Sequence, residues 1–190
     1  MPLVPVGERM EVDAQLVERV RAGDRRAVEE LYVAHNAAIR RFAQRLVGDE
    51  ASAEDIVHEA FLALPRAIRG FRGEGTLRAF LIGVAINHSR RHIRSAIKRR
   101  RATERLTERQ QLTPQTIDGA AEHARMRLAA ALVTALDQLP IDQRVVFVLC
   151  EVEQRTSIEA SAIVGAPEGT VRTRLFHAKR KLRELLEEYQ

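Results

Sequence analysis

The sequence predicts an all-α protein of two small helical domains joined by a flexible linker. Apolar residues recur every three to four positions over most of the chain, which is typical of helices with one buried face. No segment alternates polar and apolar residues for long enough to predict a sheet. One stretch, Thr103 to Glu122, is polar, contains Pro114 and Gly119, and keeps only scattered apolar residues. We interpret this stretch as the linker.

The composition excludes several classes of protein. The chain has 190 residues, of which 45% are hydrophobic and 30% charged, so it is long enough and apolar enough to bury a core. No apolar run approaches the roughly 20 residues that span a bilayer, and Met1 to Met10 lacks the pattern of a signal peptide. The single Cys150 excludes an intrachain disulfide framework and a multi-cysteine zinc site. A soluble protein of a reducing compartment is expected.

The first two helices are predicted from apolar spacing and end signals. The first presents Leu16 and Val20 on one face and ends at Gly23. Asp24 then suits the N-cap of a second helix, which continues to Gly48.

Two more helices follow before the linker, and one comes directly after it. Ser52 to Asp55 resembles a capping box and predicts the start of a third helix, in which Pro65 causes a break or a kink. Three glycines between positions 70 and 75 predict a loop before a helix from Phe80 to Arg94, which is apolar first and basic last. Helical spacing resumes beyond the linker, from Met126 to Leu139.

The C-terminal part of the chain has the pattern of a helix-turn-helix. Thr156 to Glu159 forms a capping box, which predicts a short helix from Ser157 to Val164. Gly165 supplies the turn, and Pro167 suits the first position of a longer basic helix that continues to about Glu188. In this motif the longer helix lies in the major groove of DNA. The alternative is a helical hairpin with a solvated basic face.

The charge is concentrated in two blocks. The net charge is only +5, but eight Lys or Arg and one acid lie between positions 90 and 105. A second block between 172 and 183 has six Lys or Arg and no acid, so the rest of the chain is net acidic. Two basic blocks in an otherwise acidic chain favour two contacts with a polyanion.

The last helix divides into a groove-facing side and a core-facing side. Arg172, Thr173, Phe176 and His177 share a face near its N-terminus and suit base edges and thymine methyl groups. Lys179, Arg180 and Arg183 are better placed for phosphates. The residues expected to face the domain core are Val171, Leu175, Ala178, Leu182 and Leu185.

Two motifs in the correct order resemble bacterial RNA polymerase sigma factors of the extracytoplasmic-function group, in the sigma-70 family. Leu139-Pro140, Glu159 and the run from Gly165 to Leu175 are similar to region four of that family. Gly23-Asp24, the run from Ala53 to Phe61, and Phe80-Leu81 with Val84-Ala85 and Asn87 are similar to region two. The resemblance covers about residues 12–101 and 126–187.

The resemblance implies an alternative sigma factor that binds core RNA polymerase and directs promoter-specific initiation in the cytoplasm. It implies a tail at 1–11, a region-two domain at 12–101, a linker at 102–125 and a region-four domain at 126–190. Implied partners are the clamp helices of the largest polymerase subunit, the flap of the second-largest subunit, promoter DNA and an anti-sigma factor. Neither a catalytic residue, nor a cofactor, nor a metal is implied, because the polymerase performs the chemistry.

The resemblance also assigns three sets of site residues. The residues expected to contact the −35 element are Arg172, Thr173, Arg174, Phe176, His177, Lys179 and Arg180. Those expected at the −10 element, where the duplex opens, are Asn87, Arg90, Arg91 and Arg94. Asp55, His58, Glu59 and Leu62 are expected to bind core polymerase. Asp55 and Asn87 could instead cap helices, and Phe61 suits a core better than an interface.

Several positions depart from the usual pattern of the family, among them Ala160-Ser161 in place of the usual Ile-Ala. Phe80 stands where Trp is usual, His58 replaces a common Gln, and Arg91 falls where an acid is frequent. Cys150 occupies a position that is often basic, which removes one inferred phosphate contact, and it suits a small buried hydrophobe better than a redox sensor.

Two other functions compete with the sigma-factor hypothesis. His88 and His92 have a spacing that can bind a metal ion, but they lie among arginines and lack a neighbouring Glu, which disfavours an enzyme. A promoter-bound regulator could use the helix-turn-helix alone, but it would not need the region-two motif.

Overall fold

The computed structural model describes residues 6–108 and 120–187, and these residues form helices and loops without a strand. The all-α prediction is confirmed. The chain divides into two compact units, one made mainly of residues up to His92 and the other mainly of residues from Ile93 onward. Residues 1–5 of the predicted tail, residues 109–119 of the predicted linker, and Glu188 lie outside the described residues.

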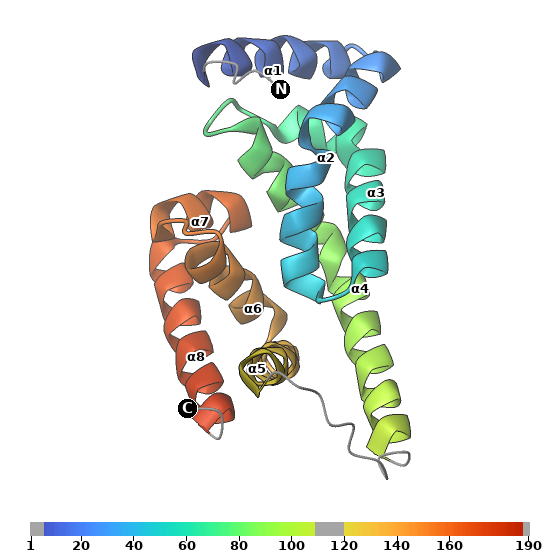
Figure 1. Ribbon diagram of the computed structural model, residues 1–190. Coiled ribbons are helices and arrows are strands. Elements are labelled where there is room, and N and C mark those ends of the chain that lie inside the picture. The colour runs from blue at the N-terminus through green and yellow to red at the C-terminus, as the bar shows by residue number, and fades with distance from the viewer. Residues whose placement is uncertain (1–5, 109–119, 188–190) are drawn as a thin grey trace. The chain divides into compact units, whose positions relative to one another are not determined.

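The first unit is built on α1 (Val6–Arg21), α2 (Arg25–Val47), α3 (Glu50–Ala67) and the start of α4 (Leu77–Glu108). Helices α2 and α3 lie side by side, and α1 packs on α2 (Figure 1). A short 3-10 helix, η1 (Ile68–Gly70), follows α3. The core between these helices is mainly apolar, and its largest fully buried members include Leu31, Ile39, Phe42, Leu46, Ile56, Leu64, Leu81 and Ile82.

The sequence signals at the ends of α2 act as predicted. The Asp24 carboxylate accepts a hydrogen bond from the backbone N–H of Arg26 at 2.9 Å. The Arg19 side chain donates to the same carboxylate at 2.8 Å and, together with the cap, lowers the pKa of Asp24. Gly48 ends α2 with φ of +75°, a conformation that glycine adopts without strain. Asp24 is therefore a cap, and Gly48 is the residue that lets the chain turn into α3.

The predicted start of α3 and the predicted break at Pro65 are both wrong. The helix starts at Glu50, because Asp49 caps it by accepting from the N–H of Ser52 at 2.8 Å, so the capping box at Ser52 to Asp55 does not form its start. The helix also continues through Pro65, since the N–H of Ile68 still bonds to the carbonyl of Leu64. Proline lacks an N–H and so removes the one hydrogen bond that position 65 would donate, and the helix tolerates this loss.

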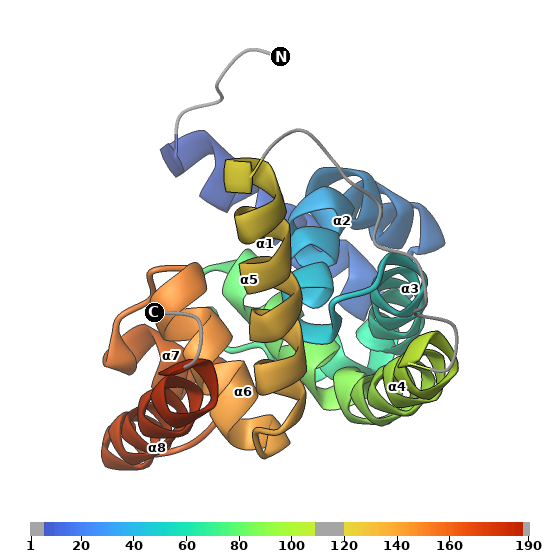
Figure 2. The ribbon, with the colours of Figure 1, turned by 60° about the horizontal axis from the view of Figure 1, so that its bottom comes forward.

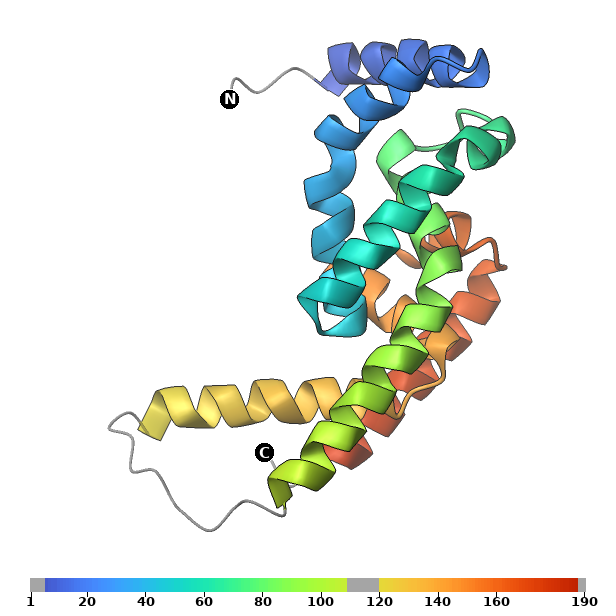
Figure 3. The same cartoon turned by 90° about the vertical axis from the view of Figure 1, so that its right-hand side faces the viewer.

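Helix α4 is longer than the sequence predicts. It begins at Leu77, where the Thr76 hydroxyl accepts from the N–H of Ala79 at 3.2 Å, and it continues to Glu108 as one long helix (Figure 3). The basic block has a strong intrinsic preference for helix and contains neither Gly nor Pro, so nothing stops the helix at Arg94. The helix enters the range predicted as linker.

The second unit contains α5 (Ala120–Asp137), α6 (Ile141–Phe147), a π-helical turn η2 (Val148–Val152), α7 (Ser157–Val164) and α8 (Glu168–Leu186). Both α5 and α6 pack against α8 (Figure 2). The N-terminal end of α5 also lies within the predicted linker range. One cluster of its core joins α5 to α8 through Ala135, Leu136, Leu139, Ala178 and Leu182.

Candidate nucleic-acid interfaces

The first candidate surface is a basic face of α4. Asn87, Arg90, Arg91 and Arg94 are all exposed, and their spacing places them on one side of the helix. Asn87 lies in the interior of α4, so it does not cap a helix. The four side chains together present amide and guanidinium groups, which suit both base edges and phosphates.

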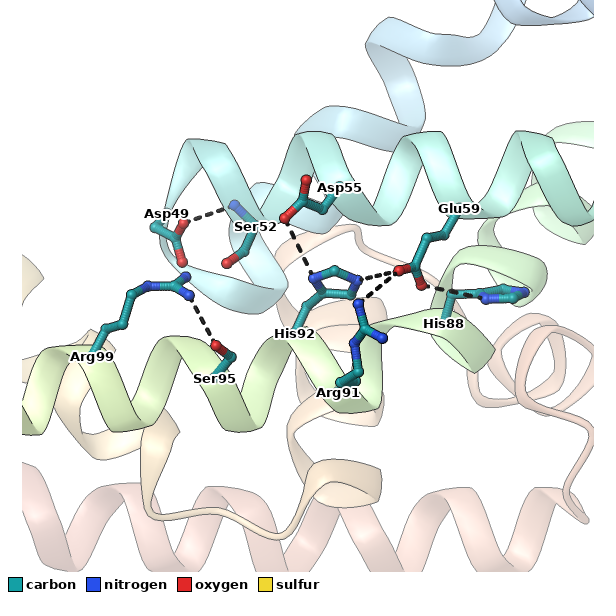
Figure 4. A network of polar contacts seen from close by, with 9 residues as sticks. All are labelled: Asp49, Ser52, Asp55, Glu59, His88, Arg91, His92, Ser95 and Arg99. Atoms are coloured by element: carbon teal, nitrogen blue, oxygen red, sulfur yellow. Dashed lines mark hydrogen bonds and ion pairs between the residues drawn. The ribbon is translucent and has the colours of Figure 1, made fainter.

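One acid on α3 holds three cationic or titratable side chains of α4 (Figure 4). Glu59 Oε1 lies 3.1 Å from His92 Nε2 and 3.3 Å from Arg91 Nη2, and Glu59 Oε2 lies 3.7 Å from His88 Nδ1. Asp55 Oδ2 lies 3.7 Å from His92 Nδ1. The His92 side chain is only 9% exposed, whereas that of Arg91 is 83% exposed. We call Asp55, Glu59, His88, Arg91 and His92 the Glu59 network.

The second candidate surface begins with the turn between α7 and α8. The N–H and the hydroxyl of Thr156 both donate to Glu159 Oε2, at 2.9 and 3.0 Å, and the N–H of Glu159 donates back to the Thr156 hydroxyl. These bonds and the nearby Arg155 lower the pKa of Glu159. The predicted capping box and the predicted helix Ser157–Val164 are confirmed. Gly165 then turns the chain with φ of +65°.

Helix α8 buries one side and exposes the other. Val171, Ala178 and Leu182 are buried, and Leu175 and Leu185 are half-buried. On the opposite side the Arg172 side chain is 73% exposed and Phe176 is 61% exposed. The ring of His177 packs on the ring of Phe176, with 5.6 Å between their centroids. A helix-turn-helix with an exposed basic face on its longer helix is thus present.

Two segments of the chain match known families. Residues 31–101 match sigma-70 region 2, and residues 129–182 match sigma-70 region 4. The RNA polymerase sigma-H factor of Pseudomonas aeruginosa is 30% identical over 93% of this chain and 95% of its own length. The RNA polymerase sigma factor CarQ of Myxococcus xanthus is 32% identical over 92% of this chain and 97% of its own. The ECF RNA polymerase sigma factor SigM of Mycobacterium tuberculosis is 27% identical over 97% of this chain and 90% of its own length.

The chain belongs to the extracytoplasmic-function group of the sigma-70 family. It is an alternative sigma factor that directs promoter-specific transcription. CnrH, solved in complex with the cytosolic domain of CnrY, has the same fold with a TM-score of 0.61 and 25% identity, covering 93% of this chain and 98% of that one. The sigma factor RpoE of Bartonella quintana, solved with the anti-sigma factor NepR, has a TM-score of 0.55 and 24% identity over 84% of this chain and 96% of that one.

In this sigma factor the four residues expected to bind polymerase do not share one environment. Asp55 is 68% exposed as a side chain, Leu62 is 68% exposed, and His58 is exposed. Glu59 is only 33% exposed, and its carboxylate contacts side chains of α4 within the Glu59 network. Three of the four residues therefore face outward from α3, and the fourth faces α4.

The alternatives left open for Asp55 and Phe61 are decided by their surroundings. Asp49, not Asp55, caps α3. Phe61 is 6% exposed and packs edge-on against Tyr32 at 5.0 Å between centroids, so it is a core residue. Phe80 is half-buried and packs against Phe71 at 5.1 Å, next to the glycine-containing loop.

The predicted −35 residues differ in how they are held. Thr173, Lys179 and Arg180 are exposed, and the Thr173 hydroxyl donates to the carbonyl of Gly169. Arg174 is half-buried on one flank of the core-facing side, where its Nη2 lies 3.1 Å from Asp142 Oδ2 of α6. Lys179 lies on the other flank, where its Nζ lies 3.1 Å from Glu151 Oε1 of η2.

The sequence does not indicate that Asp142 and Glu151 are the acidic partners of Arg174 and Lys179. Each acid is about 30 residues from its basic partner, and no local spacing rule connects residues that far apart. The pairs arise because α6 packs against α8 and η2 continues directly from α6, which is a consequence of tertiary structure.

A buried ion pair, also missed, lies under α8. Arg144 is 1% exposed, and its Nη1 lies 2.5 Å from Oδ1 of Asp137, whose side chain is 7% exposed. Burial lowers the pKa of Arg144, and the hydrogen bond to Asp137 opposes that shift. An apolar position would be expected from the helical spacing here, so the sequence gives no signal of this pair.

Cys150 and the histidines are the remaining side chains that could react or bind a metal ion. Cys150 is half-buried, and burial raises the pKa of its thiol. Within residues 6–108 and 120–187, no cluster of three or more His, Cys, Asp or Glu has the arrangement of a metal site. No helix in the same residues is long and apolar enough to cross a membrane.

Proposed function

We propose that this sigma factor binds core RNA polymerase, recognises the −35 element with α8 and the −10 element with α4, and assists opening of the duplex at the −10 element. The observation that carries the proposal is the presence of two exposed basic helix faces, one in the region that matches sigma-70 region 2 and one in the region that matches region 4.

At the −35 element, α8 enters the major groove. Arg172 pairs with a guanine edge, Thr173 contacts a base or a thymine methyl group, and Phe176 contacts such a methyl group. His177 supports the Phe176 ring, against which it packs. Lys179 and Arg180 bind phosphates and fix the register of the helix, while Arg174 contributes from its flank.

At the −10 element, the basic face of α4 offsets the cost of opening the duplex. Asn87 reads one unstacked base, because its amide offers two donors and an acceptor. Arg90, Arg91 and Arg94 hold the phosphates of the strand that carries this base. Capture of a base outside the stack lowers the free energy of the open state, which otherwise carries an unpairing cost of a few kcal/mol.

Core polymerase binds the outer side of α3 in this proposal. Asp55, His58 and Leu62 contact the clamp helices of the largest subunit, since these three side chains face outward. Glu59 acts from the inside, by holding α4 through the Glu59 network. Region four contacts the flap of the second-largest subunit. The sigma factor supplies no catalytic group or cofactor, because the polymerase performs phosphodiester synthesis.

An anti-sigma factor is a further proposed partner in the cytoplasm. CnrH and RpoE of Bartonella quintana were both solved as complexes, with the cytosolic domain of CnrY and with the anti-sigma factor NepR. The likeness of this chain to CnrH over nearly its whole length supports regulation by an inhibitor of the same kind.

Run-off transcription with purified core polymerase tests the proposal. Promoters are first selected from random DNA by the assembled holoenzyme, and transcripts are then mapped on the selected templates. Transcripts that start at one position, only when the sigma factor is added, are the expected result. Absence of specific initiation on every selected template would contradict the proposal.

A further inference from the structure

The pair between Glu151 and Lys179 joins the DNA-binding helix to the preceding segment. Lys179 Nζ lies 3.1 Å from Glu151 Oε1, and the two side chains are 49% and 36% exposed. Helical spacing places Lys179 on the same side of α8 as Arg172 and Phe176, two turns after Arg172 and about one turn after Phe176. The same amine that is proposed to bind a phosphate is therefore already held by a carboxylate of its own domain.

We propose that Glu151 is an intramolecular competitor of the DNA phosphate at Lys179, and that it limits the affinity of α8 for DNA of any sequence. The inference rests on the proposed −35 role of α8. Glu151 is thus a positioning residue, which acts on DNA through Lys179 and touches no base.

Electrostatics give the expected direction and size. A phosphate bound to Lys179 at hydrogen-bond distance lies about 6–7 Å from a carboxylate that holds the same amine, if the two anions approach from opposite sides. That separation is shorter than the Debye length of about 8 Å at physiological salt, so the repulsion is only partly screened. Replacing the carboxylate by the isosteric amide in Glu151→Gln removes it, and we expect DNA affinity to rise about 3- to 10-fold.

The salt dependence gives an independent signature. In the wild-type protein Glu151 already pairs with Lys179, so this lysine neutralises the DNA phosphate only in part and few counterions leave the DNA at this contact. In Glu151→Gln, Lys179 is a free cation in the unbound state, and the slope of log K against log salt should become steeper by about one unit. A residue that only stabilised the fold would lower affinity when replaced and would not steepen this slope.

Cys150 provides a reporter that does not depend on DNA. It is the single cysteine of the chain and the neighbour of Glu151. Burial raises the pKa of its thiol, the charge of Glu151 raises it further, and Lys179 lowers it. Glu151→Gln should therefore lower the pKa of Cys150, which the pH dependence of alkylation by iodoacetamide measures on the full chain.

The experiment combines both readouts on the full chain and its holoenzyme. The affinity for a selected promoter duplex and for a duplex with a scrambled −35 element is measured over a range of salt. The matched control is Glu187→Gln, which removes the same charge about 12 Å further along the helix axis from Lys179. We expect Glu151→Gln to lower the Cys150 pKa, tighten binding to both duplexes and steepen both salt slopes, and we expect Glu187→Gln to do none of these.

A double-mutant cycle sharpens the result. Lys179→Ala should weaken DNA binding more in the Glu151→Gln background than in the wild type, because in that background no carboxylate competes with the phosphate for the lysine charge. A lowered Cys150 pKa with unchanged affinity in Glu151→Gln would overturn the competitor role of Glu151. Failure of the −35 function itself is distinguished by Arg172→Ala, which would then leave binding to the selected promoter unchanged.

Discussion

The two basic helices carry comparable charge but hold it in different ways. On α4, His88, Arg91 and His92 converge on one carboxylate, that of Glu59. On α8, the two flanking bases have separate acids from separate elements, Asp142 for Arg174 and Glu151 for Lys179. Counting charges along the sequence does not distinguish these arrangements. The difference teaches that one substitution, at Glu59, should disturb three side chains of α4, of which Arg91 belongs to the basic face. Substitution of Asp142 or Glu151 should each disturb one basic side chain of α8.

The buried polar contacts beneath the two helices also differ. His92, which is nearly buried, lies between Asp55 and Glu59 of α3. Beneath α8 the buried carboxylate of Asp137 pairs with Arg144 at 2.5 Å and also with Arg100 of α4 at 2.6 Å.

The largest effect is expected from Asp137→Ala, which leaves the Arg144 guanidinium buried without its acid. Breaking a buried pair from one side costs about 3–5 kcal/mol of folding free energy. Amide hydrogen exchange in α6 and α8 should accelerate accordingly, while exchange in α2 and α3 should not. Asp142→Ala removes the pair with Arg174, which is longer, at 3.1 Å, and more exposed, and it should cost less than about 1 kcal/mol. Equal effects of the two substitutions would show that burial does not set the strength of these pairs.

Arg172→Ala should weaken promoter binding by about 1–3 kcal/mol, concentrated at one base pair of the −35 element. Lys179→Ala should instead weaken binding to all −35 sequences by the same factor. Binding of the holoenzyme to a set of single-substituted −35 duplexes separates the two patterns. A uniform loss for Arg172→Ala would make Arg172 a phosphate contact and would remove the proposed base readout.

Glu59→Gln should destabilise the contact between α3 and α4 by about 1 kcal/mol, because it removes the charge that pairs with Arg91 and lies beside His88 and His92. The expected observation is faster amide exchange in α3 and in the first half of α4 together. Glu54→Gln is the control, since its contact with Arg40 is 3.8 Å long and the Glu54 side chain is 69% exposed. If Glu59→Gln changes amide exchange in α3 alone, Glu59 does not hold the first half of α4 through His88, Arg91 and His92.

Thr156→Ala should cost about 1 kcal/mol, because it removes the hydroxyl that caps α7. The other half of the capping box gives a pH dependence. Since the pKa of Glu159 is lowered in the folded state, its contribution is fully present above the ordinary value of 4.5 and is lost as the pH falls through the lowered pKa. Stability measured below pH 4.5 should therefore fall more steeply in the wild type than in Glu159→Gln. Parallel curves would contradict the capping role of Glu159.

Local signals predicted much of the fold and part of each surface. The caps at Asp24 and Thr156, the turns at Gly48 and Gly165, and the exposed face of Arg172 and Phe176 depend on residues close together in sequence, which spacing rules describe well. The start of α3 was misplaced because two acceptable caps, Asp49 and Ser52, lie within one turn. The inward position of Glu59 and the acid partners of Arg174 and Lys179 depend on how helices pack, and no local rule reports that.

The most direct test of the account compares transcription on a fully duplex promoter with transcription on the same promoter opened in advance by mismatches across the −10 element. If α4 assists opening and α8 anchors the −35 element, Asn87→Ala should lower initiation strongly on the duplex and much less on the opened template. Arg172→Ala should lower initiation by the same factor on both. Equal rescue of the two variants by the opened template, or rescue of neither, would contradict the division of work between the two helices.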